Sequence, residues 1–194
     1  MKNLLEKTAQ TVLETAFGKF DFAVYRENET GKEHIVLVKA WNNKIPLVRI
    51  HSECATGDLF GSKYCDCGEQ LHLALKLIAK DGGIVIYLRQ EGRGLGLTNK
   101  ILAYELQRQG ADTVEANLKL GRGIDERNYD IALEILRSLR VDSLRLLTNN
   151  PRKIRELEDA GLSVVRVPLQ IKMSSARAKR YLKTKKEKMG HQLI

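Results

Sequence analysis

The sequence predicts an α/β fold, a mixed sheet with antiparallel N-terminal strands and a largely parallel C-terminal half flanked by helices. Up to residue 50, apolar runs of strand length are separated by short clusters of turn-forming residues such as Asn28-Glu-Thr-Gly31. Beyond residue 69, short apolar runs alternate with segments whose apolar residues recur at the spacing of a helix face. Strands that alternate with helices along the chain are typical of a parallel sheet with helices on its faces.

Three strands are expected in the N-terminal part, at residues 20–25, 34–39 and 46–50, and their short connections predict antiparallel neighbours. The helical pattern begins with Leu71, Ala74, Leu75 and Ile78, which share one helix face over about residues 69–80. The elements expected after this helix are, in chain order, a buried strand at 84–88, a helix capped by Thr98 and running to about residue 109, a helix at 127–140, a strand at 144–147, a helix that begins after Asn150 and ends at Gly161, and a strand at 164–167.

Length and charge limit the classes to which the chain can belong. A chain of 194 residues suits one domain, and 43% hydrophobic residues suffice for a packed core. No apolar run approaches the ~20 residues of a membrane span, and the N-terminus lacks the apolar region of a secretory signal, so we expect a cytoplasmic protein without membrane contact.

Residues 171–194 hold eight basic residues and one acidic residue, and so account for +7 of the net charge of +9. This segment is typical of a solvated tail, or of a surface for an anionic partner.

All three cysteines, Cys54, Cys65 and Cys67, lie between a predicted strand and a predicted helix. An odd number excludes a complete set of internal disulfides, and clustered thiolates are good zinc ligands. Three protein ligands leave a fourth position open, which is the arrangement of a catalytic zinc site. Two alternatives remain: a structural zinc site with His51 as fourth ligand, and a redox pair of Cys65 and Cys67 that leaves Cys54 unexplained.

Two loops at predicted strand ends have residues that suit phosphate groups. The loop Gly92-Arg-Gly-Leu-Gly96 lets the backbone approach a ligand at a helix N-terminus, although it fits neither the dinucleotide nor the Walker A pattern. Glu91 and Arg93 could read a base edge and a phosphate together. In the second loop, Thr148 and Lys153 suit a phosphate. The alternatives are a plain strand-to-helix turn for the first loop and an ordinary helix cap with surface cations for the second.

Three further residues have side chains that suit catalysis. Asp125 could move a proton, and Arg127 could stabilise phosphoryl charge. Most such pairs are solvated surface residues, and Tyr104, inside a predicted helix, is equally explained by core packing. Neither the pair of Asp125 and Arg127 nor Tyr104 identifies a reaction by itself.

Taken together, these motifs resemble those of GTP cyclohydrolase II, the enzyme that opens the purine ring at the start of riboflavin biosynthesis. The resemblance runs from about residue 17 through 194. The motifs that carry it, in chain order, are Arg49-Ile-His-Ser-Glu-Cys-Ala-Thr-Gly-Asp58, Cys65-Asp-Cys-Gly68, Arg89-Gln-Glu-Gly-Arg93, Asp112-Thr-Val-Glu-Ala-Asn117, Leu146-Leu-Thr-Asn-Asn-Pro-Arg-Lys153 and Lys188-Met-Gly-His191. It implies a single domain over residues 1–194 that includes the basic segment 171–194, so a nucleic-acid partner is not expected.

The resemblance also implies a reaction and its cofactors. Cys54, Cys65 and Cys67 would hold one Zn²⁺ per subunit, whose water attacks C8 of guanine. Hydrolysis of GTP releases formate and pyrophosphate and gives 2,5-diamino-6-(5-phosphoribosylamino)pyrimidin-4-one. Mg²⁺ accompanies the triphosphate, and the enzyme is a homodimer.

Residue roles follow from the same resemblance. Asp125 matches the proton acceptor, Arg127 the nucleophile or charge stabiliser at the α-phosphate, and Tyr104 a tyrosine linked to ring opening. We favour electrostatic stabilisation for Arg127, because a guanidinium has a pKa above ~12. The positions that match GTP contacts are Arg49, Ile50, His51, Ser52, Glu53, Gln70, Glu91, Gly92, Arg93, Thr113, Thr148 and Lys153. Gln70 and Glu91 are the candidates for recognition of the guanine N1–H and amino group.

Two other functions compete with this interpretation. A zinc nucleobase deaminase uses a related ligand set, but commonly with a Cys-x-x-Cys motif, whereas Cys65 and Cys67 are separated by one residue. A zinc-stabilised RNA-binding module would use the basic C-terminus, but only 6% of residues are aromatic and no base-stacking motif is present.

Overall fold

The computed structural model describes residues 4–42, 45–111, 113–121, 125, 127–169 and 171, without the side chains of residues 113, 114 and 117. Apart from Ile171, the basic segment predicted at 171–194 lies outside the described residues. The described chain divides into two compact units. The first unit comprises residues up to His51 together with Leu71–Arg89 and Tyr129–Leu169, and the second comprises Ser52–Gln70 and Gln90–Asn128.

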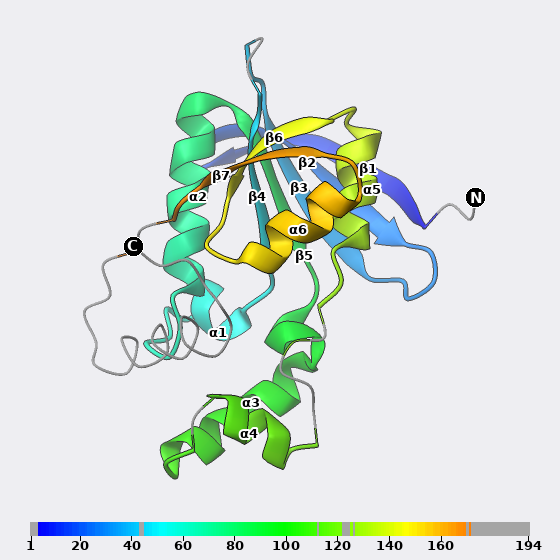
Figure 1. Cartoon of the computed structure of the whole chain (residues 1–194). Coiled ribbons are helices and arrows are strands. Elements are labelled where there is room, and N and C mark those ends of the chain that lie inside the picture. Colours follow the sequence, from blue (N-terminus) through cyan, green and yellow to red (C-terminus); the bar gives the residue numbers. More distant parts are fainter. Residues whose placement is uncertain are drawn as a thin grey trace. The chain divides into compact units, whose positions relative to one another are not determined.

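The described part of the chain contains seven strands and the helices between them (Figure 1). In sequence order the elements are β1 (Leu5–Thr15), β2 (Gly18–Glu27), β3 (Glu33–Lys39), β4 (Leu47–Ser52), α1 (Ala55–Asp58), α2 (Cys67–Asp81), β5 (Gly83–Leu88), the 3₁₀ turn η1 (Glu91–Gly94), α3 (Gly96–Arg108), α4 (Thr113–Lys119), α5 (Asp130–Ser138), β6 (Ser143–Leu147), α6 (Pro151–Asp159) and β7 (Ser163–Val167). All strands predicted from the sequence are present.

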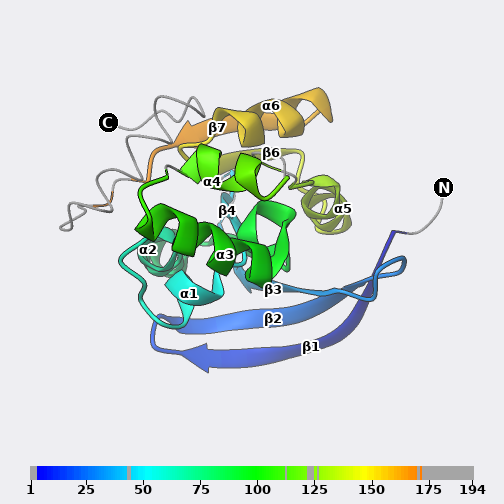
Figure 2. The ribbon, with the colours of Figure 1, turned by 90° about the horizontal axis from the view of Figure 1, so that it is seen from below.

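The seven strands form one mixed sheet in the order β1-β2-β3-β5-β4-β6-β7. The pairs β1–β2, β2–β3 and β3–β5 are antiparallel, and the pairs β4–β6 and β6–β7 are parallel. Figure 2 shows the antiparallel strands β1, β2 and β3 side by side. The predicted α/β class with a mixed sheet is therefore confirmed.

Two details of the sheet differ from the sequence prediction. The sequence predicts an antiparallel strand at 46–50, but β4 pairs in parallel with β6, and β5 lies between β3 and β4. The chain passes through α1 and α2 between β4 and β5, so β4 is joined to the next strand by a helical crossover instead of a short turn. The edge strand β1 was not predicted, because most of its side chains are exposed and it lacks apolar alternation.

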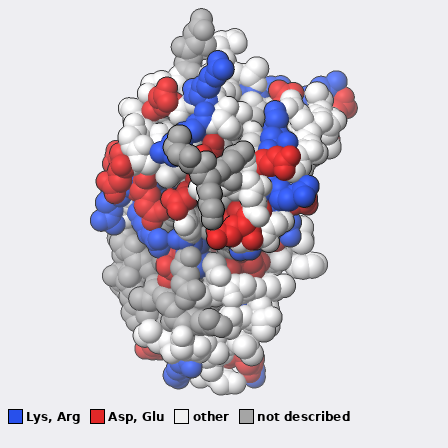
Figure 3. All heavy atoms as spheres, turned by 90° about the vertical axis from the view of Figure 1, so that its right-hand side faces the viewer, with Lys and Arg blue, Asp and Glu red and all other residues white. Residues whose placement is uncertain are grey.

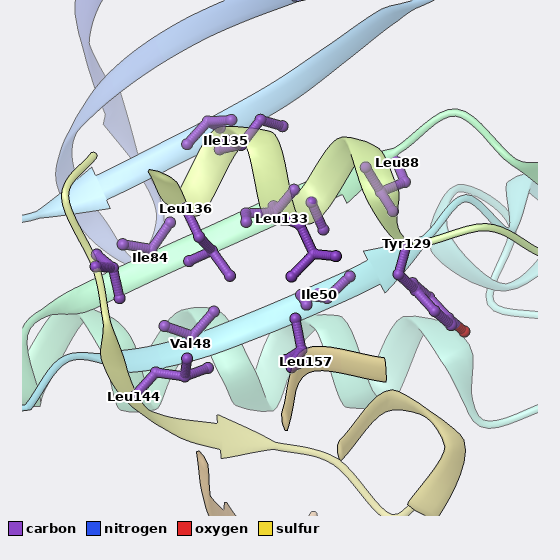
Figure 4. Close-up of a cluster of buried hydrophobic side chains, with 14 of the residues drawn as sticks. Val48, Ile50, Ile84, Leu88, Tyr129, Leu133, Ile135, Leu136, Leu144 and Leu157 are labelled. Atoms are coloured by element: carbon purple, nitrogen blue, oxygen red, sulfur yellow. The ribbon is translucent and has the colours of Figure 1, made fainter. Parts of the chain in front are cut away.

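The strands bury both faces, and successive residues of one strand contribute to different clusters. Ile84 and Ile86 of β5 belong to a cluster that includes Leu133 of α5 and Leu157 of α6 (Figure 4). The intervening Val85 belongs to a second cluster that also contains residues of α2. Because side chains alternate across a strand, helices α5 and α6 cover one face of the sheet and α2 covers the other.

Helix boundaries follow the sequence prediction less closely than the strands do. Asn150 caps α6 by accepting a hydrogen bond from Arg152 N at 3.0 Å, with Pro151 in the first turn, as predicted. The predicted cap Thr98 is wrong: α3 begins at Gly96, and Thr98 lies inside it. The helix expected from residue 127 begins at Asp130, and the short helices α1 and α4 were not predicted.

The described helices are not suited to a membrane span, and the charges on one face of the molecule are mixed. Within the described ranges, no helix combines the length and the hydropathy that crossing a bilayer requires. On the face drawn in Figure 3, Lys and Arg side chains are interspersed with Asp and Glu side chains.

Candidate functional site

The three cysteine sulfurs lie together in the second unit. Cys54 follows β4, Cys65 lies in the loop before α2, and Cys67 is the first residue of α2. All three are free thiols, and their Sγ atoms lie within 4.8 Å of one another, with Cys54 and Cys65 3.6 Å apart. The described residues hold one such group of potential metal ligands, and it consists of these cysteines. This arrangement is compatible with a metal ion such as zinc.

Two glycines bring the backbone of α1 against this cluster. A Cβ at Gly57 would lie 2.9 Å from Cys65 Sγ and 3.1 Å from Cys54 Sγ. A Cβ at Gly68 would lie 2.2 Å from the Gly57 carbonyl oxygen. Any larger side chain at either position would push α1 and the start of α2 apart, so the sulfur cluster depends on both glycines.

Hydrogen bonding among the thiols makes Cys54 the most acidic of the three. The pKa of Cys54 is held far below its ordinary value, because the Cys65 and Cys67 thiols and Lys100 donate to its sulfur. The pKa of Cys65 is raised by its hydrogen bond with Cys54, and that of Cys67 is raised further by its bonds with both other sulfurs and by burial. Of the three thiols, Cys54 is therefore the one whose surroundings most favour the thiolate, the form in which cysteine binds a metal.

A buried ion pair adjoins the cysteines. Lys100 Nζ of α3 lies 3.0 Å from Cys54 Sγ and 2.9 Å from Glu91 Oε1. Glu91 also accepts hydrogen bonds from the backbone N–H groups of Ala55 and Gly92, each at 2.6 Å. Burial alone would lower the pKa of Lys100, but the hydrogen bonds to Cys54 and Glu91 raise it above its ordinary value. The ammonium group is therefore charged.

The loop that carries Glu91 has an unusual backbone. Gly92 and Arg93 both have positive φ angles, of 61° and 63°. For arginine this left-handed conformation is strained by about 1–2 kcal/mol, and such strain is commonly found at functional sites. The glycine-rich loop predicted from the sequence is therefore a tight turn that leads into α3.

Tyr104 lies one helical turn beyond Lys100 on α3. Its hydroxyl lies 3.4 Å from Thr56 Oγ1, which is itself 3.8 Å from Cys54 Sγ. Its ring stacks on Tyr64, with ring centroids 4.6 Å apart. Thr56, Tyr64 and Tyr104 line a cavity of about 380 Å³ within this unit. Tyr104 is thus part of the surroundings of the cysteine cluster.

Asp125 and Arg127 form a bidentate ion pair before α5. Arg127 Nε donates to Asp125 Oδ1 at 2.8 Å, and Arg127 Nη2 to Asp125 Oδ2 at 2.5 Å. The Arg127 side chain is only 14% exposed and that of Asp125 only 11%, so this is not a solvated surface pair. The pairing fixes the plane of the guanidinium group.

A second group of predicted residues lies in the first unit, at the ends of β4 and β6. Buried Arg49 donates to the Leu147 carbonyl oxygen at 3.0 Å, and its Nη2 lies 3.3 Å from His51 Nδ1. Lys153 is buried, donates to the Ile50 carbonyl oxygen at 2.6 Å and lies 5.3 Å from the Tyr129 ring centroid. Thr148 Oγ1 accepts from Asn150 N at 3.1 Å. These polar groups at the carboxyl ends of strands occupy the usual position of ligand sites in such sheets.

The other residues predicted to contact GTP are Ile50, Ser52, Glu53, Gln70 and Thr113. Gln70 donates to Asp66 Oδ2 at 2.6 Å, and Ser52 Oγ accepts from Gln90 at 2.9 Å. The Ile50 side chain packs in the hydrophobic core, so only its backbone is available to a ligand. Glu53 is half-buried between β4 and α1, and the side chain of Thr113 lies outside the described residues.

Comparison with known proteins identifies the family. Residues 6–168 match the family model described as GTP cyclohydrolase II. The chain belongs to the GTP cyclohydrolase II family. It is 50% identical to the GTP cyclohydrolase-2 of Acinetobacter baumannii strain SDF, over 96% of both chains. It is also 52% identical to the riboflavin biosynthesis protein RibBA of Bacillus subtilis and 51% identical to that of Phocaeicola vulgatus, and it spans about half the length of these two relatives.

Membership of the GTP cyclohydrolase II family confirms the resemblance found in the sequence motifs. The structure adds contacts of three residues that have no predicted role: Lys100, Thr56 and Gly57 all contact the cysteine cluster or its neighbours. Lys100 and Tyr104 are four residues apart in a predicted helix, a spacing that places both side chains on one helix face. Gly57 lies within the Arg49–Asp58 motif, but its role depends on the packing of α1 against α2, which the motif does not show.

Proposed function

We propose that the chain is a GTP cyclohydrolase II that opens the imidazole ring of GTP by hydrolysis and releases formate and pyrophosphate. The observation that carries this proposal is the convergence of the Cys54, Cys65 and Cys67 sulfurs within 4.8 Å in a member of this family. A purely structural zinc site would require a fourth protein ligand, and the cluster in the described part of the chain offers three.

The donor set suits zinc. Three thiolates are soft ligands that favour this ion, and the packing of Gly57 leaves the sulfurs free to converge on one point. Zinc bound there would supply an activated water for hydrolysis at neutral pH. The lowered pKa of Cys54 favours its thiolate form, which is the form that binds a metal.

The chain's own residues would bind and orient GTP. Lys153, Thr148 and Arg49 supply a cation, a hydroxyl and a guanidinium group at strand ends, which suit phosphate groups. Gln70 and Glu91 are the candidates for the guanine edge, and the Glu91 oxygens also accept backbone and lysine N–H groups. The proposed GTP contacts are Arg49, Ile50, His51, Ser52, Glu53, Gln70, Glu91, Gly92, Arg93, Thr113, Thr148 and Lys153.

Three residues would take part in the chemistry. Asp125 accepts a proton, and its bidentate bond to Arg127 orients the guanidinium group that stabilises charge at the α-phosphate. Tyr104, whose hydroxyl lies near Thr56, assists ring opening. An electrostatic role for Arg127 fits a guanidinium that already binds a carboxylate, because that pairing favours its charged form.

Further features belong to the same proposal. Mg²⁺ would accompany the triphosphate and neutralise part of its charge. The active form would be a cytoplasmic homodimer without a nucleic-acid partner.

The test is to incubate the protein with GTP and Mg²⁺ and to quantify formate and pyrophosphate, with and without a zinc chelator. Equal amounts of both products, lost on chelation and restored by added zinc, are expected. Pyrophosphate without formate would show that the ring stays closed and would contradict the proposal. Ammonia without formate would favour a deaminase, and salt-dependent RNA binding without turnover would favour an RNA-binding module.

A further inference from the structure

Lys100 is a buried cation that belongs to none of the predicted binding or catalytic residues. Its side chain is only 10% exposed, and Glu91, its ion-pair partner, is 9% exposed. Its Nζ lies 3.0 Å from Cys54 Sγ and 2.9 Å from Glu91 Oε1, so one ammonium group bridges a sulfur and a carboxylate. Lysine is rarely buried unless paired, so these two contacts account for its position.

The position of Lys100 is fixed from both sides. Glu91 is held by the backbone N–H groups of Ala55 and Gly92, so its carboxylate cannot rotate freely. Ala55 directly follows Cys54 in the chain, and Gly92 lies in the left-handed turn before α3. Lys100 thus completes a closed set of hydrogen bonds that joins the first cysteine to the glycine-rich loop.

The positive charge of Lys100 would affect a metal bound by Cys54. Three thiolates around a divalent metal leave one net negative charge in a poorly solvated place, and the ammonium group compensates it. An N–H···S hydrogen bond also withdraws electron density from the sulfur, which weakens its donation to the metal and leaves the metal more electrophilic. Hydrogen bonds to ligand atoms commonly tune metal sites in this way.

We propose that Lys100 is a positioning residue of the metal centre, which donates a hydrogen bond to the Cys54 thiolate and so sets its donor strength toward the metal. This rests on the proposed function only in taking Cys54 as a metal ligand. A competing explanation is that Lys100 serves only to pair with Glu91 and support the fold. The two explanations differ in whether the electronic state of the Cys54 sulfur changes when Lys100 is replaced.

The experiment uses Co²⁺ in place of zinc, because sulfur-to-cobalt charge-transfer absorption reports thiolate donation directly. The unsubstituted protein and the variants Lys100→Met, Lys100→Gln and Lys100→Arg are titrated with Co²⁺ alone. Lys119→Met, at an exposed lysine of α4, is the matched control. Formate release from GTP by the zinc-loaded proteins is measured separately.

The Lys100→Met band is expected at longer wavelength than that of the unsubstituted protein, with Lys100→Gln between them. Lys100→Arg, which keeps a charged N–H donor, and Lys119→Met should leave the band nearly unchanged. Formate release by Lys100→Met should fall about 10- to 100-fold, as for other residues that bind a metal ligand. An unshifted band in Lys100→Met would overturn the proposal, and if that variant does not fold, an unshifted band in Lys100→Gln would do so.

The cobalt measurement needs no substrate, so the two proposals can fail separately. Thiolate-to-cobalt bands that shift as expected, in a protein that releases no formate, would contradict the proposed function and support the role of Lys100. Formate release together with an unchanged band in the Lys100 variants would support the proposed function and contradict the role of Lys100.

Discussion

Gly57 lies directly against Cys65, and a Cβ on residue 57 would come within 2.9 Å of the Cys65 sulfur. The same Cβ would also crowd Cys54 Sγ at 3.1 Å. A single methyl group would therefore force two of the three sulfurs apart, although Gly57 offers no ligand atom itself.

Substitution Gly57→Ala is expected to weaken zinc binding by at least about tenfold, since the sulfurs must move to admit the methyl group. Competition with a chromophoric chelator measures the affinity. Leu59→Ala, in the same segment but at a side chain that is 75% exposed, should bind zinc as the unsubstituted protein does. Equal affinities for Gly57→Ala and Leu59→Ala would show that the cluster tolerates the methyl group.

Glu91→Gln tests whether this carboxylate holds the structure together or reads the substrate. An amide cannot accept from Ala55 N, Gly92 N and Lys100 as the carboxylate does, because one of its two terminal atoms is a donor. The free energy of unfolding should fall by about 1–3 kcal/mol. Denaturant titration measures the change, with the exposed Glu69→Gln as control. Unchanged stability with a raised KM for GTP would instead assign Glu91 to guanine recognition.

Arg127→Lys tests the bidentate role of the guanidinium group. Lysine can replace the charge but not the paired N–H groups that donate to Asp125 at 2.8 and 2.5 Å. Pyrophosphate release should fall at least about 100-fold, the usual cost of removing one oriented donor from an active site. Arg108→Lys makes the same change at an exposed ion pair and should have no effect on turnover. Near-full release by Arg127→Lys would exclude the bidentate role.

His34 gives the first unit a dependence of stability on pH. Burial lowers its pKa below the value of about 6.5 for an exposed histidine, with Glu27 opposing and Lys32 and Arg89 reinforcing the shift. Its Nδ1 accepts from Arg89 N at 3.1 Å, and its Nε2 lies 3.9 Å from Glu27. The unfolded chain therefore binds a proton more readily than the folded chain, so stability is complete above about pH 6.5 and is lost as the pH falls through the folded-state pKa.

The expected result is a thermal midpoint that falls as the pH drops below about 6.5 in the unsubstituted protein, and that falls less in His34→Gln. Differential scanning calorimetry at each pH measures the midpoints. His72→Gln, at an exposed histidine, should follow the unsubstituted protein. Parallel pH dependence in all three proteins would show that His34 does not control this loss of stability.

Patterns of residues close together in the sequence were sufficient to predict most strands, the start of α6 and the cysteine cluster. Apolar runs of strand length predicted six of the seven strands, and the Asn150-Pro151 pair predicted the start of α6. Cysteine spacing predicted the cluster of three sulfurs, because the cysteines lie within fourteen residues of sequence from Cys54 to Cys67. Each of these signals depends on residues near one another in the chain, so sequence alone could determine them.

The tertiary structure decided the features that join distant segments. The parallel pairing of β4 with β6 depends on a crossover, and the buried bond between Lys100 and Cys54 depends on how α3 folds within its unit. Neither leaves a periodic pattern, because hydrogen bonds and van der Waals contacts between remote residues depend on packing geometry. The sequence could therefore determine which residues have side chains suited to a metal or a phosphate. Only packing determined that Lys100 contacts both the Cys54 sulfur and the Glu91 carboxylate, and that β4 pairs with β6.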